Sequence, residues 1–281
     1  MRASWPSHSL RGARTLDLAG RGPGSSSRAS SRSPATGAGP EGSGRERELG
    51  RSYPDGIAET CRILLFDIDG TLVSTGGAGA VAWKRAFEEL HGIPADIGQY
   101  TDAGMTDPDV GARTFEAVMH REATARELAQ LIQRRLEHLP EAVAESEGYR
   151  VLPGVSERLK QLSRAGHLLG LITGNGDGAA HIKLARGNLN RWFTFGAYAS
   201  AGVDRPGIVR RAVERGEAML GRDMPNAEIY VIGDTPLDIE AAHAVECTAI
   251  GVATGRYDQA ALRDARADHV LGTLEEELPL D

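Results

Sequence analysis

The segment of residues 63–72 constrains the fold of this chain more than any other, because it joins an apolar run to a pair of acids. Residues 63–66 are apolar without alternation, which is typical of a strand buried on both faces of a parallel sheet. Asp67 and Asp69 follow, and Gly70 then turns the chain. Ligands of open α/β sheets bind beyond the carboxyl ends of strands, so the two acids are well placed for chemistry. Taken alone, the segment also fits an exposed Asp-Gly hairpin turn with two solvated acids.

After residue 150 the chain alternates between strand-like and helix-like segments. Apolar runs that predict strands lie at residues 168–173, 193–200, 229–233 and 248–253. Segments that predict helices lie at residues 155–162, 206–220, 236–245 and 259–265. Such alternation predicts an α/β fold in which a doubly wound parallel sheet is connected by crossover helices.

Residues 76–149 interrupt this alternation and are predicted to be entirely helical. The first helix carries apolar residues at i, i+4 and i+7 from Trp83 and ends near Gly92. A second helix is expected to begin at Thr106-Asp107-Pro108, with the acid as its cap. A leucine-rich third helix is expected to be closed by Pro140. The predicted α/β core therefore consists of residues 58–75 and 150–281, with an inserted all-helical module of residues 76–149.

Residues 1–57 have a different composition, with ten Gly, eleven Ser and five Pro but few bulky apolar residues. Such a segment cannot bury enough surface to offset the entropy lost on ordering, so we predict a disordered tail. Its nine Arg and five acids give a net charge of +4 and leave −11 on residues 58–281. Arg and Ser enrichment is typical of organelle transit peptides, but the scattered Gly and Pro oppose the amphipathic helix that such a peptide needs.

Charge and hydropathy exclude several classes of partner. A formal net charge of −7 argues against a general nucleic-acid binder. No apolar run approaches the length of a membrane span, so no membrane partner is expected. Cys61 and Cys247 are too few for a disulfide framework, and reduced buried thiols in a cytoplasmic protein are the simplest account.

Further candidate site residues lie at or after the ends of other predicted strands. Thr173, Gly174 and Asn175 offer a hydroxyl and free backbone N–H groups at a strand-to-helix junction, a site suited to an anion. Arg205 precedes a helix that begins with proline, and its guanidinium suits a phosphate group. In isolation, Thr173 also fits an ordinary helix cap and Arg205 an ordinary surface arginine.

Asp234 ends the apolar run at 229–233, and Asp238 follows four residues later. A helix cap would explain Asp234 alone, but not the recurrence of acids and phosphate-binding groups at so many strand ends. Asp67, Asp69 and Asp234 together predict a cluster of hard oxygen ligands, whose mutual repulsion a cation would relieve. Hard oxygens combined with open water positions suit Mg²⁺.

These four segments, in this order, resemble the four motifs of the haloacid dehalogenase superfamily, in particular its phosphoglycolate-phosphatase-like branch. The resemblance covers residues 61–281, and the helical module resembles the helical cap of that family, with residues 76–79 as its hinge. It implies that Asp67 is the nucleophile and Asp69 the general acid and base. It further implies that Mg²⁺ is held by Asp67, Asp234 and the backbone carbonyl of Asp69.

The resemblance also implies roles for the remaining positions. Asp238 corresponds to an acid that holds a metal-bound water or orients its neighbours, and Thr173 to the phosphate-binding hydroxyl. Arg205 is a departure, since most relatives have lysine there, although the positive charge is kept. Arg210 or Arg211, one helical turn later, is an alternative for this basic site.

The expected function is Mg²⁺-dependent hydrolysis of a small phosphorylated metabolite by a monomer or homodimer. Asp69 argues against a haloalkanoate dehalogenase or a phosphonate hydrolase, both of which lack this second acid. A sugar phosphomutase of the same superfamily shares every core motif and stays open. A non-catalytic binding protein that acts through its Arg-rich tail is a further alternative. Substrate choice is expected to reside in residues 76–149, with Met105 and Thr106 as candidates.

Overall fold

The computed structural model describes residues 61–280. The predicted disordered tail lies outside the described residues. The domain boundaries inferred from the sequence therefore stay predictions, whereas the elements themselves can be compared with the structure.

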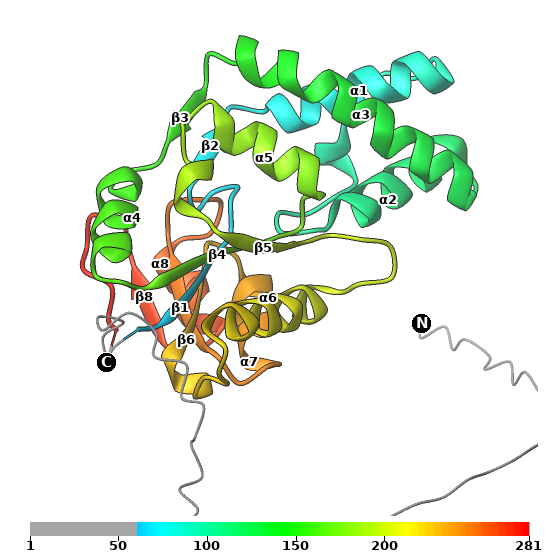
Figure 1. The fold of residues 1–281 in the computed structure, drawn as a ribbon. Helices are drawn as coiled ribbons and strands as arrows, with labels where there is room; N and C mark the ends of the chain where they lie inside the picture. Colours follow the sequence, from blue (N-terminus) through cyan, green and yellow to red (C-terminus); the bar gives the residue numbers. More distant parts are fainter. Residues whose placement is uncertain (1–60, 281) are drawn as a thin grey trace, which may run out of the picture. The chain divides into compact units, whose positions relative to one another are not determined.

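A six-stranded parallel sheet forms the centre of the described structure, in the order β5-β4-β1-β6-β7-β8 (Figure 1). Its strands are β1 (Ile63–Phe66), β4 (Leu168–Thr173), β5 (Phe195–Tyr198), β6 (Ile229–Gly233), β7 (Thr248–Val252) and β8 (His269–Leu271). The chain winds outward from β1 in both directions, so the strand order reverses there, and an open sheet binds its ligands at that point. The predicted α/β fold class is confirmed.

Helices cover both faces of the sheet. The helices α4 (Val155–Arg164) and α5 (Asp177–Ala185) contribute to one apolar cluster, together with Leu64 and Phe66 of β1. The opposite cluster contains Ile63 and Leu65 of β1 together with the helices α6 (Arg205–Leu220), α7 (Pro236–His243) and α8 (Gln259–Asp264). Strand β1 is thus buried on both faces, as its unbroken apolar run predicted.

The helical insert consists of α1 (Ala78–His91), α2 (Asp107–Met119) and α3 (Ala125–Glu145), with a short 3₁₀ helix at Ile97–Gln99. Its apolar core includes Trp83, Phe87, Phe115 and Leu131. Two short strands, β2 (Val73–Thr75) and β3 (Tyr149–Val151), pair antiparallel where the chain enters and leaves the insert. The sequence analysis predicted the helices but not this two-stranded connection, because each strand has only three residues.

Pro140 does not close the third helix, contrary to the sequence prediction, because α3 continues to Glu145. Proline removes one backbone hydrogen bond but leaves the other contacts of the helix intact. Beyond Pro140, Ala142 and Val143 pack into an apolar cluster with Ala78 and Ala82 of α1. Burial of this face compensates for the missing bond and carries the helix one further turn.

Other boundaries also differ from the predictions. Strand β5 is shorter than the predicted 193–200. It begins later because the backbone N–H of Phe193 bonds to the carbonyl of Asn190 and caps the 3₁₀ helix at Asn190–Trp192. Helix α2 is capped by Thr106 and not by Asp107, since the Thr106 side chain accepts from the N–H of Asp109. Strand β8 was not predicted.

Two predictions about residue environment can be compared directly with the described part of the chain. Cys61 and Cys247 are both buried and free. Among the helices of residues 61–280, none is sufficiently long and apolar to cross a membrane.

Two glycines with left-handed backbones test how the C-terminal segment packs on α4. Gly154 (φ +79°) and Gly166 (φ +84°) differ in their surroundings: a methyl group at Gly154 would lie 2.2 Å from the backbone nitrogen of Glu275, whereas nothing lies within 4 Å at Gly166. Gly166→Ala should lower the free energy of unfolding by about 1–2 kcal/mol, the conformational cost alone. Gly154→Ala should cost clearly more, because the backbone at Glu275 must move. Urea denaturation measures both, and equal losses would contradict this packing.

Candidate functional site

Three buried carboxylates converge at the carboxyl ends of β1 and β6. These strands are parallel neighbours, and the N–H of Asp67 donates to the carbonyl of Ile232 at 2.9 Å. Asp67 and Asp234 therefore leave the sheet side by side, and Asp238 joins them from the first turn of α7. One carboxylate oxygen from each of the three lies within 4.8 Å of the others. The predicted convergence of Asp67 and Asp234 thus exists, with the Asp238 side chain as the third member of the cluster.

The space around Asp234 is so tight that its neighbours must lack a side chain. A methyl group at Gly70 would lie 2.3 Å from a carboxylate oxygen of Asp234, and one at Gly255 would lie 1.7 Å from it. The hydroxyl of Thr71 donates to the other oxygen at 3.0 Å. The absence of a side chain at Gly70 therefore allows Asp234 to lie close to the backbone, and Gly70 also forms the turn after β1.

Arg205 is the cation that faces this cluster. At the start of α6 and buried, it lies 3.1 Å from Asp67 through Nη2, and its Nε donates to Asp238 at 3.1 Å. The alternatives Arg210 and Arg211 are exposed on the same helix, where Arg211 donates to the hydroxyl of Ser200. Of the three arginines considered from the sequence, the structure brings only Arg205 to the carboxylates.

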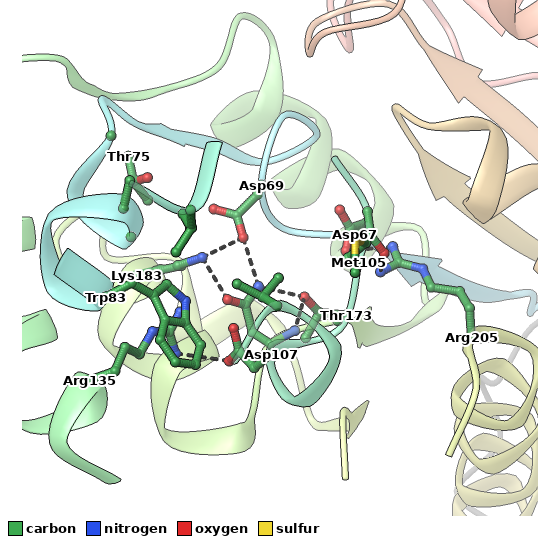
Figure 2. Close-up of a pocket in the computed structure, with 18 residues that line it drawn as sticks. Asp67, Asp69, Thr75, Trp83, Met105, Asp107, Arg135, Thr173, Lys183 and Arg205 are labelled. Carbon is green, nitrogen blue, oxygen red and sulfur yellow. Dashed lines mark hydrogen bonds and ion pairs between the residues drawn. The ribbon is translucent and has the colours of Figure 1, made fainter. Parts of the chain in front are cut away.

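A second polar cluster lies beside the first, at the end of β4. The Oδ2 atom of Asp69 accepts from Lys183 Nζ at 2.6 Å and from Asn175 Nδ2 at 2.7 Å (Figure 2). Asn175 also donates to the hydroxyl of Thr173 from its side chain, at 2.8 Å, and from its backbone, at 3.2 Å. The carboxylate of Asp69 is thus paired with Lys183 instead of joining the three-carboxylate cluster.

Gly174 lies between this cluster and the helical insert. A methyl group there would lie 2.6 Å from the carbonyl oxygen of Met105 and 3.0 Å from Nη1 of Arg205. The carbonyl of Gly174 accepts from the N–H of Asp107 at 2.6 Å. The insert therefore packs directly on the loop that follows β4.

Burial and like charges raise the pKa values of two carboxylates of the first cluster, Asp67 and Asp234. Burial raises the pKa of Asp67 to about 7, although the charge of Arg205 opposes the shift and Asp238 adds to it. Burial, then the charges of Asp67 and Asp238, raise the pKa of Asp234 to about 8. Burial would lower the pKa of Arg205, but Asp238 and Asp67 hold it above its ordinary value. One arginine does not balance three acids.

Asp69 shows the opposite behaviour. Burial would raise its pKa, but the charge of Lys183 and hydrogen bonds from Lys183 and Asn175 hold the pKa below its ordinary value. The two acids of the segment after β1 therefore have different electrostatic environments, although they are one residue apart. Such a separation of pKa values is typical of acids with different roles in one site.

Sequence reasoning missed Lys183. It lies on the buried face of α5 with Ala179, Ala180 and Leu184, and its side chain is 6% exposed. A lysine in an otherwise apolar helical stripe is the signal that could have identified it, because buried lysine is rare unless it is paired.

The insert also supplies a buried pair that the sequence analysis did not identify. Arg135 of α3 donates to Asp107 at 2.8 Å, and its guanidinium lies 5.4 Å from the ring centroid of Trp83. The same Asp107 oxygen accepts from the N–H of Gly176 at 2.8 Å. Of the two candidates for substrate choice, Met105 lines the cavity described next, whereas Thr106 serves as the cap of α2.

A cavity of about 180 Å³ lies between the insert and the sheet, and Figure 2 shows the side chains around it. Its sheet side is lined by Asp67, Asp69, Thr173, Asn175, Lys183 and Arg205. Its insert side includes Trp83, Met105 and Arg135. The cavity therefore places a nucleophile candidate, several cations and a helical lining around a volume that suits a small anion.

Residues 64–243 match the family model of the haloacid dehalogenase-like hydrolases, and this span is well over half of the chain. The chain belongs to this family and is an enzyme of the hydrolase class, as the motifs predicted. Among curated proteins, a phosphoglycolate phosphatase of Pseudomonas syringae pv. tomato is 28% identical over 198 residues, which cover 67% of this chain and 69% of the relative.

Solved structures have the same fold. A predicted phosphoglycolate phosphatase from Haemophilus somnus matches with a TM-score of 0.61 at 18% identity, covering 76% of this chain and 95% of that protein. A hydrolase from Pseudomonas syringae matches with a TM-score of 0.59 at 24% identity, covering 78% and 95%. A protein proposed to be a β-phosphoglucomutase, from Bacteroides vulgatus, matches with a TM-score of 0.58 at 21% identity, covering 76% and 84%.

The raised pKa values predict how stability depends on pH when no metal is bound. Asp67 and Asp234 ionise at about 7 and 8 when folded and at about 3.8 when unfolded, so between about pH 4 and pH 8 the folded state binds more protons. In EDTA, the free energy of unfolding should therefore fall as the pH rises through this range. Asp234→Asn should make the free energy of unfolding less dependent on pH. Asp69→Asn should leave this dependence unchanged, because the pKa of Asp69 is lowered and not raised. Urea denaturation across this range measures the slopes; an unchanged slope in Asp234→Asn would contradict the assignment.

Proposed function

We propose that this protein is a Mg²⁺-dependent phosphatase that hydrolyses a small phosphorylated metabolite through an aspartyl-phosphate on Asp67. The observation that carries the proposal is the convergence of three buried carboxylates with Arg205, a group from which Asp67 and Arg205 line the cavity. The similarity to a phosphoglycolate phosphatase supports a substrate of that size and charge. A cytoplasmic location and a monomeric or homodimeric state stay predictions from the sequence.

The residues present fit a divalent cation. Three carboxylates share one facing arginine, and burial, followed by the charges of the neighbouring acids, raises the pKa values of Asp67 and Asp234. A bound cation would offset both effects. Carboxylate and carbonyl oxygens are the ligands that Mg²⁺ prefers. Asp67, Asp234 and the backbone carbonyl of Asp69 would hold the ion, and when bound it would reduce the repulsion between the Asp67 carboxylate and an anionic phosphoryl group.

Asp238 is proposed to orient Arg205 and not to hold the ion itself. It accepts from Arg205 Nε at 3.1 Å, and its other oxygen accepts from the N–H and the hydroxyl of Thr235 at 3.1 and 2.8 Å. With its oxygens already engaged by these donors, Asp238 is suited to fix the guanidinium beside Asp67.

In the first chemical step, a carboxylate oxygen of Asp67 forms a bond to phosphorus as the bond to the substrate oxygen breaks. Asp69 gives a proton to that departing oxygen. In the second step, a water oxygen attacks phosphorus, Asp67 is released, and Asp69 takes the proton from the water. Thr173, the N–H group of Gly174 and Arg205 would hold the remaining phosphoryl oxygens, where charge is spread in the transition state. The N–H of Asn175 donates to the Thr173 hydroxyl instead.

The helical insert is proposed to act as a cap that excludes water and selects the substrate. Its support is the cavity that it shares with the sheet, together with the contacts of Asp107 to Gly174 and Gly176. Closing such a cap over the substrate would strengthen the electrostatic interactions beneath it.

Substitution of the proposed nucleophile tests the mechanism. Asp67→Asn keeps the shape of the side chain but removes the attacking carboxylate, so turnover should fall by about 10⁴-fold or more. Phosphate release measures the activity, and circular dichroism checks that the fold is intact. Asp223→Asn, which changes an exposed acid outside the site, is the matched control and should keep full activity. Activity of Asp67→Asn near that of the control would contradict the nucleophile assignment.

Metal removal and product analysis test the reaction class. Treatment with EDTA should abolish phosphate release from a panel of phosphorylated metabolites that includes phosphoglycolate, and added Mg²⁺ should restore it. A colorimetric phosphate assay gives the rate, and phosphorus NMR identifies the products. Phosphate transferred to another position of a sugar, without net release, would favour the phosphomutase alternative. Activity that survives in EDTA would contradict the metal requirement.

A further inference from the structure

We propose that Lys183 is a positioning residue that holds the carboxyl group of Asp69 in the orientation needed for proton transfer. This inference rests on the proposed phosphatase function, because it concerns the acid and base of that reaction. Lys183 lies outside the four motif segments, and its contacts with Asp69 and Asn175 support this role.

A closed triangle of hydrogen bonds joins Lys183, Asn175 and Asp69. The ammonium group donates to Asp69 Oδ2 and to Asn175 Oδ1, both at 2.6 Å. The Nδ2 group of Asn175 donates to the same Asp69 oxygen at 2.7 Å. Two donors that converge on one carboxylate oxygen restrict the rotation of the Asp69 carboxyl group more than a single hydrogen bond would.

The backbone around Lys183 places its ammonium group where Asp69 lies. Side chains on a helix point toward the N-terminus of the helix, so Lys183 reaches back along α5 toward the end of β4. The hydroxyl of Tyr149 in β3 donates to the Lys183 carbonyl at 2.7 Å and ties this turn to the connection with the insert. From the other side, a methyl group at Gly79 of α1 would lie 3.9 Å from Nζ.

A buried lysine is a poor means of stabilising a fold. Removing an ammonium group from water costs several kcal/mol, and its pairing with a carboxylate often does no more than offset that cost. Lys183 is nevertheless buried, and it lines the cavity beside the proposed acid. Its place against Asp69, and not in the apolar cores of the sheet, is explained by a role in the reaction.

Lys183 is better placed to orient Asp69 than to bind the phosphoryl group. The cation beside the proposed nucleophile is Arg205, at 3.1 Å from Asp67, whereas the ammonium of Lys183 is engaged by Asp69 and Asn175. A general acid must lie within hydrogen-bond reach of the departing oxygen, and a displacement of about 1 Å can cost about 100-fold in rate. Losing Lys183 should therefore impair the step that uses Asp69.

Leaving-group dependence separates this role from a structural one. An alkyl phosphate such as phosphoglycolate needs a proton on its departing oxygen, whereas p-nitrophenolate departs as a stable anion. Lys183→Met should lower kcat for phosphoglycolate, or for the best alkyl phosphate of the panel, by about 100-fold. For p-nitrophenyl phosphate, the loss should stay within about threefold, because general acid catalysis contributes little there.

A double-mutant cycle tests whether Lys183 acts through Asp69. Adding Lys183→Met to Asp69→Asn should cause no further loss of kcat with either substrate, because residue 69 no longer has a carboxyl group for Lys183 to orient. Lys183→Gln, which keeps a donor without the charge, should lie between wild type and Lys183→Met. It also serves as the test variant if thermal denaturation shows that Lys183→Met does not fold. Lys160→Met, at a partly exposed position on α4 outside the site, is the matched control and should match wild type.

The outcomes distinguish the two proposals. Equal losses with both substrates, or a further loss in the Asp69→Asn background, would overturn the positioning role and indicate phosphoryl binding or a purely structural contact. A wild-type enzyme that hydrolyses neither substrate nor any other member of the panel would instead contradict the proposed function itself.

Discussion

Repulsion among buried carboxylates is the constraint on which the rest of the site depends. Asp67, Asp234 and Asp238 lie within reach of one another with Arg205 as their cationic neighbour, and burial together with the neighbouring charges raises the pKa values of Asp67 and Asp234. Such a cluster is costly for stability and persists because the surrounding structure determines it, through the parallel pairing of β1 with β6 and the start of α7. Under the proposed function, a divalent cation would relieve this repulsion and allow an anionic substrate to approach Asp67.

The helical insert is joined to this site by specific polar contacts. Asp107 accepts from Arg135 of α3 and from the N–H of Gly176, so one buried oxygen connects the insert to the loop after β4. Asn175, next to Gly176, holds Asp69 together with Lys183. A movement of the insert would therefore displace residues that contact Asp69, the proposed acid and base. The contacts of the proposed cap are thus continuous with those that hold the proposed acid and base.

Sequence reasoning succeeded where one local pattern dictates the environment. The unbroken apolar run before Asp67 identified a doubly buried strand, and the positions of Thr173 and Asp234 after similar runs placed them at the same edge of the sheet. It failed where contacts between distant segments determine where a helix ends or which charges pair. Pro140 was expected to end a helix, but packing on α1 carries α3 past it. Lys183 was missed because its partner Asp69 is 114 residues away in the sequence.

The sequence by itself determined the alternation of the longer strands and helices, the fold class and the positions of the acids, because apolar periodicity and turn residues act over a few residues. Only the tertiary structure decided which charges meet. It paired Asp69 with Lys183, brought Asp238 rather than the Asp69 side chain into the carboxylate cluster, and chose Arg205 over its exposed neighbours. The physical reason is that ion pairing depends on distances of a few ångströms between residues far apart in the chain, which no local pattern encodes.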